Sequence, residues 1–501
     1  MTAKAIAVLG TASDVGKSLI TAGICRLLRR EGIRVAPFKA QNMSLNSFVT
    51  PEGGEIGRAQ ALQAEACRLL PHVDMNPILL KPEADNRSQV VVLGKVFAKL
   101  DASTYFDRRE ELFHIVQESY TRLAADHDMV VIEGAGSAAE VNLRDRDLVN
   151  WPVVQLANAK VVLVADIDRG GVFAQIIGTL NLLERNERER ICGIVINKFR
   201  GDRKLFDDGI RFVEGRTGIP VLGLVPFVRD LTLDQEDILD VKCGRQVEFT
   251  AHRVNIGVLL LPHLSNFTDF NVLAAEHDVA LRYISSATEV KEADVVVIPG
   301  SKNTLADLRY LWEKGFVAAC GRHVSNKKEL VGICGGYQML GLRVSDPNRV
   351  EEGGSADGLG LLNVETEMTQ DKRTILVYGY SIGLDDSGYS PVCGYQIRMG
   401  RTNNLGDRPR FALMTTTGCE EWDGAVNSEG LVWGTYVHGV FDQPGFRRQW
   451  LNSIRARKGS SAIDVQVSEG VTTWQQHELD RWTDHLVAHL DLSSLLIDLK
   501  Q

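Results

Sequence analysis

The stretch Ala5-Ile-Ala-Val-Leu9-Gly10-Thr-Ala-Ser-Asp-Val-Gly16-Lys17-Ser18 decides the first half of the fold. Its apolar run predicts a buried strand, the glycines predict a loop, and a helical pattern follows. In such a loop the backbone N–H groups bind phosphate, Lys17 neutralises phosphate charge and the hydroxyl of Ser18 is placed for magnesium. Five residues separate the two glycines, one more than in the usual phosphate-binding loop, so a glycine turn with an incidental lysine is the alternative.

Residues at the ends of three other apolar runs are candidates for the same site. Glu133 stands where a second metal ligand beside Ser18 would be, with a solvated strand end as the alternative. Asn197 offers an amide suited to reading a nucleotide base, and Lys39 could line the same crevice, with a plain loop as an equal alternative. The predicted ATP-binding residues are Gly10, Thr11, Ser13, Gly16, Lys17, Ser18, Lys39 and Asn197, and the predicted ligands of Mg²⁺ are Ser18 and Glu133.

Short β-rich runs alternate with helical patterns up to about residue 228, which predicts an α/β fold with a mainly parallel sheet. The expected strands of this sheet are 5–9, 35–38, 129–132, 161–165, 191–196 and 221–225, and the expected helices are 19–30, 58–70, 109–125, 172–187 and 204–217. Ligands of such sheets lie at the carboxyl ends of the strands, where the candidate residues are found.

A second α/β pattern follows an acidic, irregular linker. Its expected strands are 255–261, 295–298, 330–333 and 431–437, with loops and irregular strands inserted over 351–360 and 378–404. Trp474, Trp482 and Leu486 recur at helical spacing, so we expect one or two helices in the tail. The predicted domains are 1–228 for the nucleotide site, 229–253 for the linker, 254–447 for the second α/β domain and 448–501 for the helical tail.

The second domain carries a cysteine in the string Leu330-Val-Gly-Ile-Cys334-Gly335-Gly-Tyr-Gln-Met-Leu-Gly341. Glycines on both sides permit a sharp turn between a strand and a helix, which is how a chain presents a nucleophile for acyl transfer. A small buried cysteine among packing glycines is the alternative. His438 ends another predicted strand and supplies the base that a cysteine nucleophile needs.

The composition argues against some classes of function. The net charge is -9 and no block of lysine or arginine stands out, so we expect no nucleic-acid partner. The eight cysteines are scattered without metal-ligand spacing, which indicates reduced thiols and a cytoplasmic protein. The N-terminal residues lack the pattern of a signal peptide, and no apolar run has membrane-spanning length, so we expect no membrane partner.

Taken together, the two candidate sites indicate one chemistry. Phosphorylation of a carboxylate by ATP makes an acyl phosphate that ammonia can attack. A nucleophilic cysteine can release that ammonia from glutamine through a thioester. We therefore expect an ATP-driven amidation in which Cys334 supplies the ammonia.

Longer strings point to a family. The chain resembles the glutamine-dependent cobyric acid synthases of cobalamin biosynthesis through Lys39-Ala-Gln-Asn-Met-Ser, Glu55-Ile-Gly-Arg-Ala-Gln-Ala-Leu-Gln-Ala-Glu65, Asn76-Pro-Ile-Leu-Leu-Lys-Pro82 and Asn142-Leu-Arg-Asp-Arg-Asp-Leu-Val-Asn150. The N-terminal half resembles the ATP domain of dethiobiotin synthetases. The C-terminal half resembles class I glutamine amidotransferases through Pro299-Gly-Ser-Lys-Asn-Thr304, the cysteine turn and Tyr436-Val-His-Gly-Val-Phe441.

The resemblance implies the reaction and the roles of its residues. The family amidates the four peripheral carboxylates b, d, e and g of adenosylcobyrinic acid a,c-diamide, with one ATP and one glutamine for each. By matching position, Cys334 attacks glutamine and His438 acts first as base and then as acid. Gly300 and Gly335 provide the N–H groups of the oxyanion hole. Asp147 is expected to position metal or ammonia, with a helix cap as the alternative.

One departure from the amidotransferase pattern concerns the histidine. Most class I members read His-x-Glu, with the glutamate orienting the histidine, whereas this chain reads His438-Gly-Val440. Either another group orients His438 or a dyad works alone. Because of the missing acid, we expect weak glutaminase activity until the synthetase site is occupied.

Two rival functions share parts of this pattern. Cobyrinic acid a,c-diamide synthase has the same two-domain plan and amidates other carboxylates, but the strings at 55–65 and 76–82 speak against it. A partition-type ATPase scaffold shares the longer phosphate loop, but it leaves Cys334 and His438 without a purpose.

Overall fold

The computed structural model describes residues 3–84, 87–228, 231–233, 247–382, 389–464 and 471–492. The chain forms two compact units: unit 1 comprises Met1–Ser44, Glu55–Glu236 and Gln475–Gln501, and unit 2 comprises Leu45–Gly54 and Asp237–Trp474. This division differs from the expected domains in two places, because Leu45–Gly54 belongs to unit 2 and the end of the chain returns to unit 1. The acidic stretch 234–237 of the expected linker lies outside the described residues.

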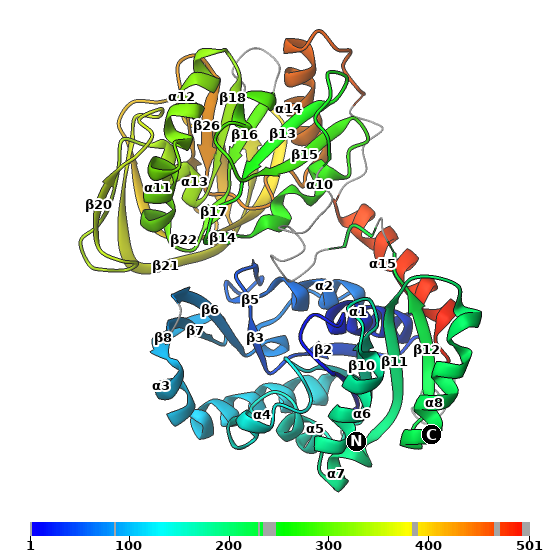
Figure 1. Cartoon of the computed structure of the whole chain (residues 1–501). Coiled ribbons are helices and arrows are strands. Elements are labelled where there is room, and N and C mark those ends of the chain that lie inside the picture. Colours follow the sequence, from blue (N-terminus) through cyan, green and yellow to red (C-terminus); the bar gives the residue numbers. More distant parts are fainter. Residues whose placement is uncertain are drawn as a thin grey trace. The chain divides into compact units, whose positions relative to one another are not determined.

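Unit 1 is built on a parallel sheet with the strand order β12-β11-β10-β1-β9-β2 (Figure 1). Its strands are β1 (Lys4–Gly10), β2 (Val35–Phe38), β9 (Met129–Glu133), β10 (Lys160–Asp166), β11 (Ile191–Phe199) and β12 (Val221–Pro226). Each contains one of the expected strands, which confirms the predicted α/β class. Ala5, Ala7 and Leu9 enter one apolar core and Ile6 and Val8 enter another, so both faces of the sheet are buried.

Helices pack on both faces of this sheet. They are α1 (Lys17–Arg30), α2 (Arg58–Ala66), α4 (Arg109–Asp126), α5 (Trp151–Leu156), α6 (Val172–Leu182), α7 (Arg185–Arg188) and α8 (Asp207–Thr217). A further helix, α3 (Ala102–Asp107), packs against α4. The expected single helix over 172–187 was wrong, because Leu183 is extended and Glu184 caps a new helix. A small sheet of β3 (Gln41–Met43), β6 (Ile78–Ala84), β7 (Arg87–Val92) and β8 (Lys95–Asp101) also belongs to unit 1.

Unit 2 contains a second sheet with the strand order β15-β13-β16-β18-β26-β25. Its strands are β13 (Val254–Leu259), β15 (Val279–Ile284), β16 (Val295–Ile298), β18 (Glu329–Ile333), β25 (Ala425–Val426) and β26 (Val432–Thr435), all parallel except β25. The helices of this part are α10 (Asn271–Ala274), α11 (Thr304–Glu313), α12 (Phe316–Ser325), α13 (Gly335–Leu340) and α14 (Pro444–Arg457).

A largely antiparallel sheet stands where loops and irregular strands were expected. It contains β19 (Arg343–Asp346), β20 (Gly354–Asp357), β21 (Val364–Ser381), β22 (Pro391–Asn404), β23 (Phe411–Thr415) and β24 (Glu420–Asp423). The expectation was wrong because β21 and β22 pair from Val364–Asn404 to Tyr380–Pro391. Val364, Thr366 and Met368 are buried while Glu365 and Glu367 are exposed, the alternation of a strand with one covered face.

The C-terminal helix α15 (Val471–His489) confirms the expected helical tail and packs against α1 within unit 1. Arg26 donates two hydrogen bonds to the carboxylate of Asp480, at 2.7 and 2.9 Å. Leu486 lies over Gly23, where a Cβ would be 2.2 Å from its Cδ1 atom. Among the described residues, no helix combines the length and the apolar character needed to cross a membrane.

Replacing Leu486 with alanine should therefore weaken unit 1. Leu486 is 1% exposed, and truncating a buried leucine of this kind costs about 2–5 kcal/mol. Urea denaturation of the full chain should show a lower free energy of unfolding for the transition that includes α15. Val487→Ala, at a position that is 49% exposed on the same helix, is the control and should change it by less than about 0.5 kcal/mol. Equal losses in both variants would contradict this packing.

Candidate active site

Cys334 occupies the sharp turn that the sequence predicts between β18 and α13. Its φ of 52° lies in the left-handed region, which is strained for a residue with a side chain. The neighbouring glycines make the turn possible: a Cβ on Gly336 would be 1.9 Å from the carbonyl oxygen of Ile298, and one on Gly332 would be 2.6 Å from that of Gly336. Backbone strain of this kind is typical of a nucleophile presented between a strand and a helix.

His438 follows β26 and has a carboxylate partner. Its Nδ1 atom is 2.7 Å from Oδ2 of Asp269, and the N–H of Gly439 donates to Oδ1 of Asp269 at 3.0 Å. His438 and Asp269 are 2% and 4% exposed, so the pair is shielded from water. With Nδ1 engaged by Asp269, Nε2 is the ring atom left to exchange a proton with a nucleophile.

The environment of His438 favours its charged form. Burial alone lowers the pKa of His438. Opposing effects raise this pKa to about 10: the negative charge of Asp269, the Cys334 sulfur, and hydrogen bonds to both residues. His438 is therefore an imidazolium at neutral pH. An imidazolium beside a cysteine can give its proton to the group that leaves when the sulfur attacks.

Asp269 is the functional residue that the sequence did not reveal. It belongs to the short helix η4 (Phe267–Phe270), 169 residues before His438, and no local motif marks it. Of the two possibilities that the sequence left open, the structure supports another orienting group, because Asp269 supplies the carboxylate that binds His438. Val440, at the usual place of the glutamate, is 1% exposed and packs in the apolar core instead.

The two predicted oxyanion-hole glycines both lie beside the nucleophilic turn. A Cβ on Gly300 would be 3.2 Å from Cε1 of His438, and one on Gly335 would be 2.9 Å from the backbone N of Ser301. Ser301 is held by a 2.6 Å hydrogen bond to the buried carboxylate of Asp307. The loop after β16 is thus fixed close to both Cys334 and His438.

In unit 1, the predicted phosphate loop connects β1 to α1. Gly16 has φ +95°, and a Cβ there would be 2.2 Å from Nδ2 of Asn197. Asn197 donates to the carbonyl oxygen of Val15 at 2.9 Å, so its amide braces the loop. Thr11 is buried at the start of the loop and Ser13 is exposed at its tip.

Lys17 joins the phosphate loop to the loop after β9. Its Nζ donates to the carbonyl oxygens of Ala12, at 3.0 Å, and of Gly136, at 2.9 Å. Asn150 holds the second loop through two hydrogen bonds with the backbone of Ala135, at 2.9 and 3.0 Å. Asn150 was not among the predicted site residues, although it closes one of the strings that resemble the family.

Glu133 is a buried carboxylate beside the phosphate loop. Its Oε1 accepts from Ser18 Oγ at 2.8 Å and from Lys39 Nζ at 3.0 Å, and its Oε2 accepts from Gln63 at 2.5 Å. Burial raises its pKa, but the charge of Lys39 and these hydrogen bonds outweigh burial and lower it. An ionised carboxylate next to a hydroxyl offers the oxygen ligands that Mg²⁺ prefers, so these residues fit that ion.

The carboxylate of Asp147 binds backbone N–H groups at the start of α5. Its Oδ1 accepts from the backbone N–H groups of Val149 and Asn150, at 2.8 and 3.0 Å, and its Oδ2 accepts from that of Trp151 at 2.9 Å. These contacts resemble the helix cap that the sequence offered as the alternative. The expectation that Asp147 positions metal or ammonia stays a prediction.

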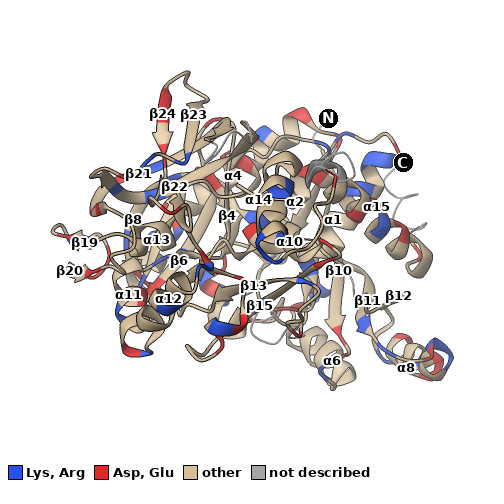
Figure 2. Cartoon of the chain, turned by 90° about the horizontal axis from the view of Figure 1, so that it is seen from above, with Lys and Arg blue, Asp and Glu red and all other residues tan. Residues whose placement is uncertain are grey.

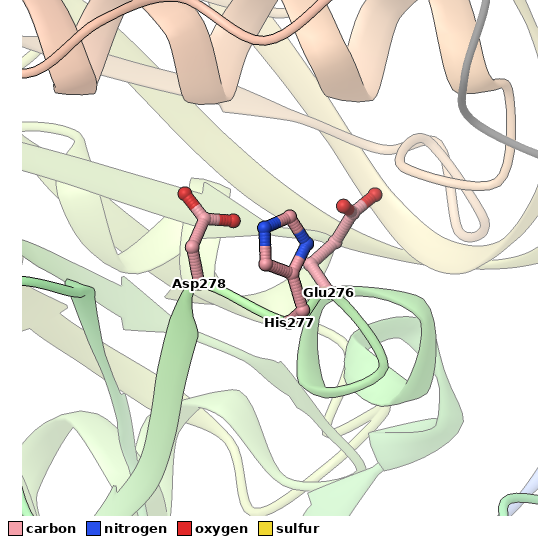
Figure 3. A group of neighbouring side chains, drawn as sticks. All are labelled: Glu276, His277 and Asp278. Carbon is pink, nitrogen blue, oxygen red and sulfur yellow. The ribbon is translucent and has the colours of Figure 1, made fainter.

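Glu276, His277 and Asp278 form another group of possible metal ligands (Figure 3). Arginines of α14 already bind both carboxylates: Arg447 and Arg448 bind Glu276, and Arg455 binds Asp278, at 2.7 to 2.8 Å. These charges are satisfied by ion pairs that fasten α14 to its unit. Elsewhere acidic and basic residues are interspersed, as along α8 in Figure 2.

Replacing Asp269 with asparagine should lower the pKa of His438 from about 10, because the amide removes the negative charge that stabilises the imidazolium. Titration of His438 by NMR in the full chain measures the change. The expected direction is downward, since burial alone disfavours the charged ring. An unchanged pKa would show that Asp269 is not the group that holds the proton on His438.

Comparisons with known proteins agree with both sites. Residues 6–239 match the CobQ/CobB/MinD/ParA nucleotide binding domain, and residues 255–446 match the CobB/CobQ-like glutamine amidotransferase domain. The chain is 44% identical to a cobyric acid synthase of Syntrophobacter fumaroxidans, over 98% of each chain. It is 47% identical to one of Yersinia enterocolitica, over 99% of this chain and 98% of the relative.

These matches extend over nearly the whole of each protein and contain both domains. The fold and both sites described above lie within the matched residues. The chain belongs to the cobyric acid synthase family.

Proposed function

We propose that the protein converts adenosylcobyrinic acid a,c-diamide to adenosylcobyric acid by amidating carboxylates b, d, e and g, with one ATP and one glutamine for each. The observation that carries this proposal is the presence in one chain of the Cys334–His438–Asp269 arrangement and of Glu133 beside Lys17 and Ser18. The first arrangement suits acyl transfer from glutamine, and the second suits phosphoryl transfer from ATP.

In the glutamine half-reaction, the sulfur of Cys334 attacks the side-chain amide carbon of glutamine. His438 transfers its proton to the leaving nitrogen, ammonia departs, and a glutamyl thioester remains. His438 then takes a proton from the water that hydrolyses the thioester. The N–H groups of Gly300 and Gly335 stabilise the oxyanion, each worth about 3–4 kcal/mol in comparable sites.

In the synthetase half-reaction, a corrinoid carboxylate attacks the terminal phosphorus of ATP, ADP leaves, and an acyl phosphate forms. Ammonia then attacks the acyl carbon, phosphate leaves with the C–O bond electrons, and the new amide nitrogen loses a proton. Backbone N–H groups from Gly10 to Gly16 bind the phosphates and Lys17 neutralises their charge. Ser18 and Glu133 would hold Mg²⁺, which supplies further neutralisation of the phosphates when bound. Asn197 keeps the loop in shape and Lys39 keeps Glu133 ionised.

The rival functions account for less of the chain. The near-complete match to cobyric acid synthases favours the proposed reaction over a,c-diamide synthesis and over a partition-type scaffold. The expectation of weak glutaminase activity rested on a missing acid, and Asp269 removes that reason.

The direct test is to incubate the protein with ATP, magnesium, glutamine and the a,c-diamide and to count the new amides by mass spectrometry. Four amides at completion are expected. A product that stops at fewer would reject the assignment of this substrate and product.

A second test separates the half-reactions. Cys334→Ala should abolish glutamine-dependent amidation and leave amidation with ammonium salt, since the synthetase site needs only ammonia. Cys419→Ala, which removes an exposed thiol of unit 2, is the matched control and should retain both activities. Glutamine-dependent amidation that persists in Cys334→Ala would show that Cys334 does not supply the ammonia.

A further inference from the structure

The stretch Leu45–Gly54 lies between two segments of unit 1 in sequence but belongs to unit 2. We call it the inserted segment. It contains strand β4 (Ser47–Val49), which is followed by a closed turn. In that turn the N–H of Thr50 donates to the carbonyl oxygen of Gly54 at 2.8 Å, and the N–H of Gly54 donates to Thr50 Oγ1 at 3.0 Å.

The inserted segment binds the loop that carries the triad carboxylate. The side-chain oxygen of Asn46 accepts from the N–H of Phe267 at 3.2 Å, and the N–H of Ser47 donates to the side-chain oxygen of Asn266 at 3.2 Å. Asn266 has φ +50° and caps the short helix of Asp269. The two hydrogen bonds therefore hold the start of the turn that aims Asp269 at His438.

The inserted segment also contacts the aromatic neighbour of the catalytic histidine. The hydroxyl of Tyr395 donates to the carbonyl oxygen of Ser47 at 3.1 Å, and Phe48 packs edge-on against the same ring. The other side of Tyr395 stacks on His438, with ring centroids 5.3 Å apart and an interplanar angle of 23°. Backbone hydrogen bonds at 2.8 and 3.1 Å join Tyr395 and His438 in both directions.

We propose that the inserted segment is a positioning element of the glutamine site, with Asn46 fixing the loop of Asp269 and Ser47 fixing Tyr395 against His438. The inference rests on the proposed function, because it assigns these residues a task in glutamine hydrolysis. Asn46 and Tyr395 act through Asp269 and His438, so they are positioning residues. The nucleotide-binding half of the sequence thus contributes to the chemistry of the other half.

Two variants remove these contacts. Asn46→Ala deletes the acceptor for Phe267, and Tyr395→Phe keeps the ring on His438 but deletes the hydroxyl that binds Ser47 and Asn266. Each should lower kcat for glutamine hydrolysis about 10- to 100-fold, because small displacements of catalytic groups cost this much, with KM for glutamine changed less than about twofold. Amidation driven by ATP and ammonium salt should stay within about twofold of the unaltered protein.

A second measurement distinguishes positioning from a general loss of stability. If Asp269 is held less well, the pKa of His438 falls, and the basic limb of kcat/KM for glutamine should move to lower pH. Matched controls remove the same groups at exposed sites. Tyr380→Phe on β21 and Asn326→Ala at the end of α12 should leave kcat and the pH profile unchanged.

Unchanged kcat and an unchanged basic limb in folded Asn46→Ala and Tyr395→Phe would overturn the inference. A fall in glutaminase activity would also overturn the inference if the content of folded protein fell equally and the basic limb of the pH profile did not move. The proposed function fails separately, if the unaltered protein hydrolyses glutamine but forms no corrinoid amide with ATP and ammonium salt.

Discussion

The hydrogen bond between His438 and Asp269 is the contact on which the glutamine site depends. Both groups are buried, and either one without its partner would destabilise the folded protein, because an unpaired charge in a low-dielectric interior is costly. Together they hold a proton on the imidazole and fix its tautomer. The contact also joins η4 to the end of β26, two elements far apart in sequence, and sets them beside the turn of Cys334. The same hydrogen bond therefore orients the catalytic histidine and stabilises the fold.

Unit 1 also contains a buried carboxylate, which several different partners stabilise. Glu133 is 1% exposed, and its charge is balanced by Lys39 and by hydrogen bonds from Ser18 and Gln63. These partners come from three elements that meet at the carboxyl ends of β1, β2 and β9. In both units a buried carboxylate is therefore held in one orientation by several partners. Such preorganisation lets charge develop during the reaction without large rearrangement.

Local patterns in the sequence predicted those parts of the structure that depend on residues close together along the chain. The six strands of the parallel sheet in unit 1 and the turn of Cys334 follow from apolar runs and glycine positions, and the structure contains all of them. Asp269 could not be found in this way, since its partnership with His438 is a tertiary contact. Asp147 allowed two interpretations because one acidic residue after a polar run fits both a helix cap and a ligand. The position of Leu45–Gly54 in unit 2 also depends on long-range contacts, which the spacing of apolar residues along the sequence does not indicate.

The central claim is that the nitrogen released at Cys334 is the nitrogen added at the ATP site. Glutamine labelled with ¹⁵N in its side-chain amide, supplied with ATP, magnesium and the a,c-diamide, tests it most directly, because the mass of each product reports the origin of its amides. The account predicts one ¹⁵N in every new amide. New amides that lack the label would contradict it.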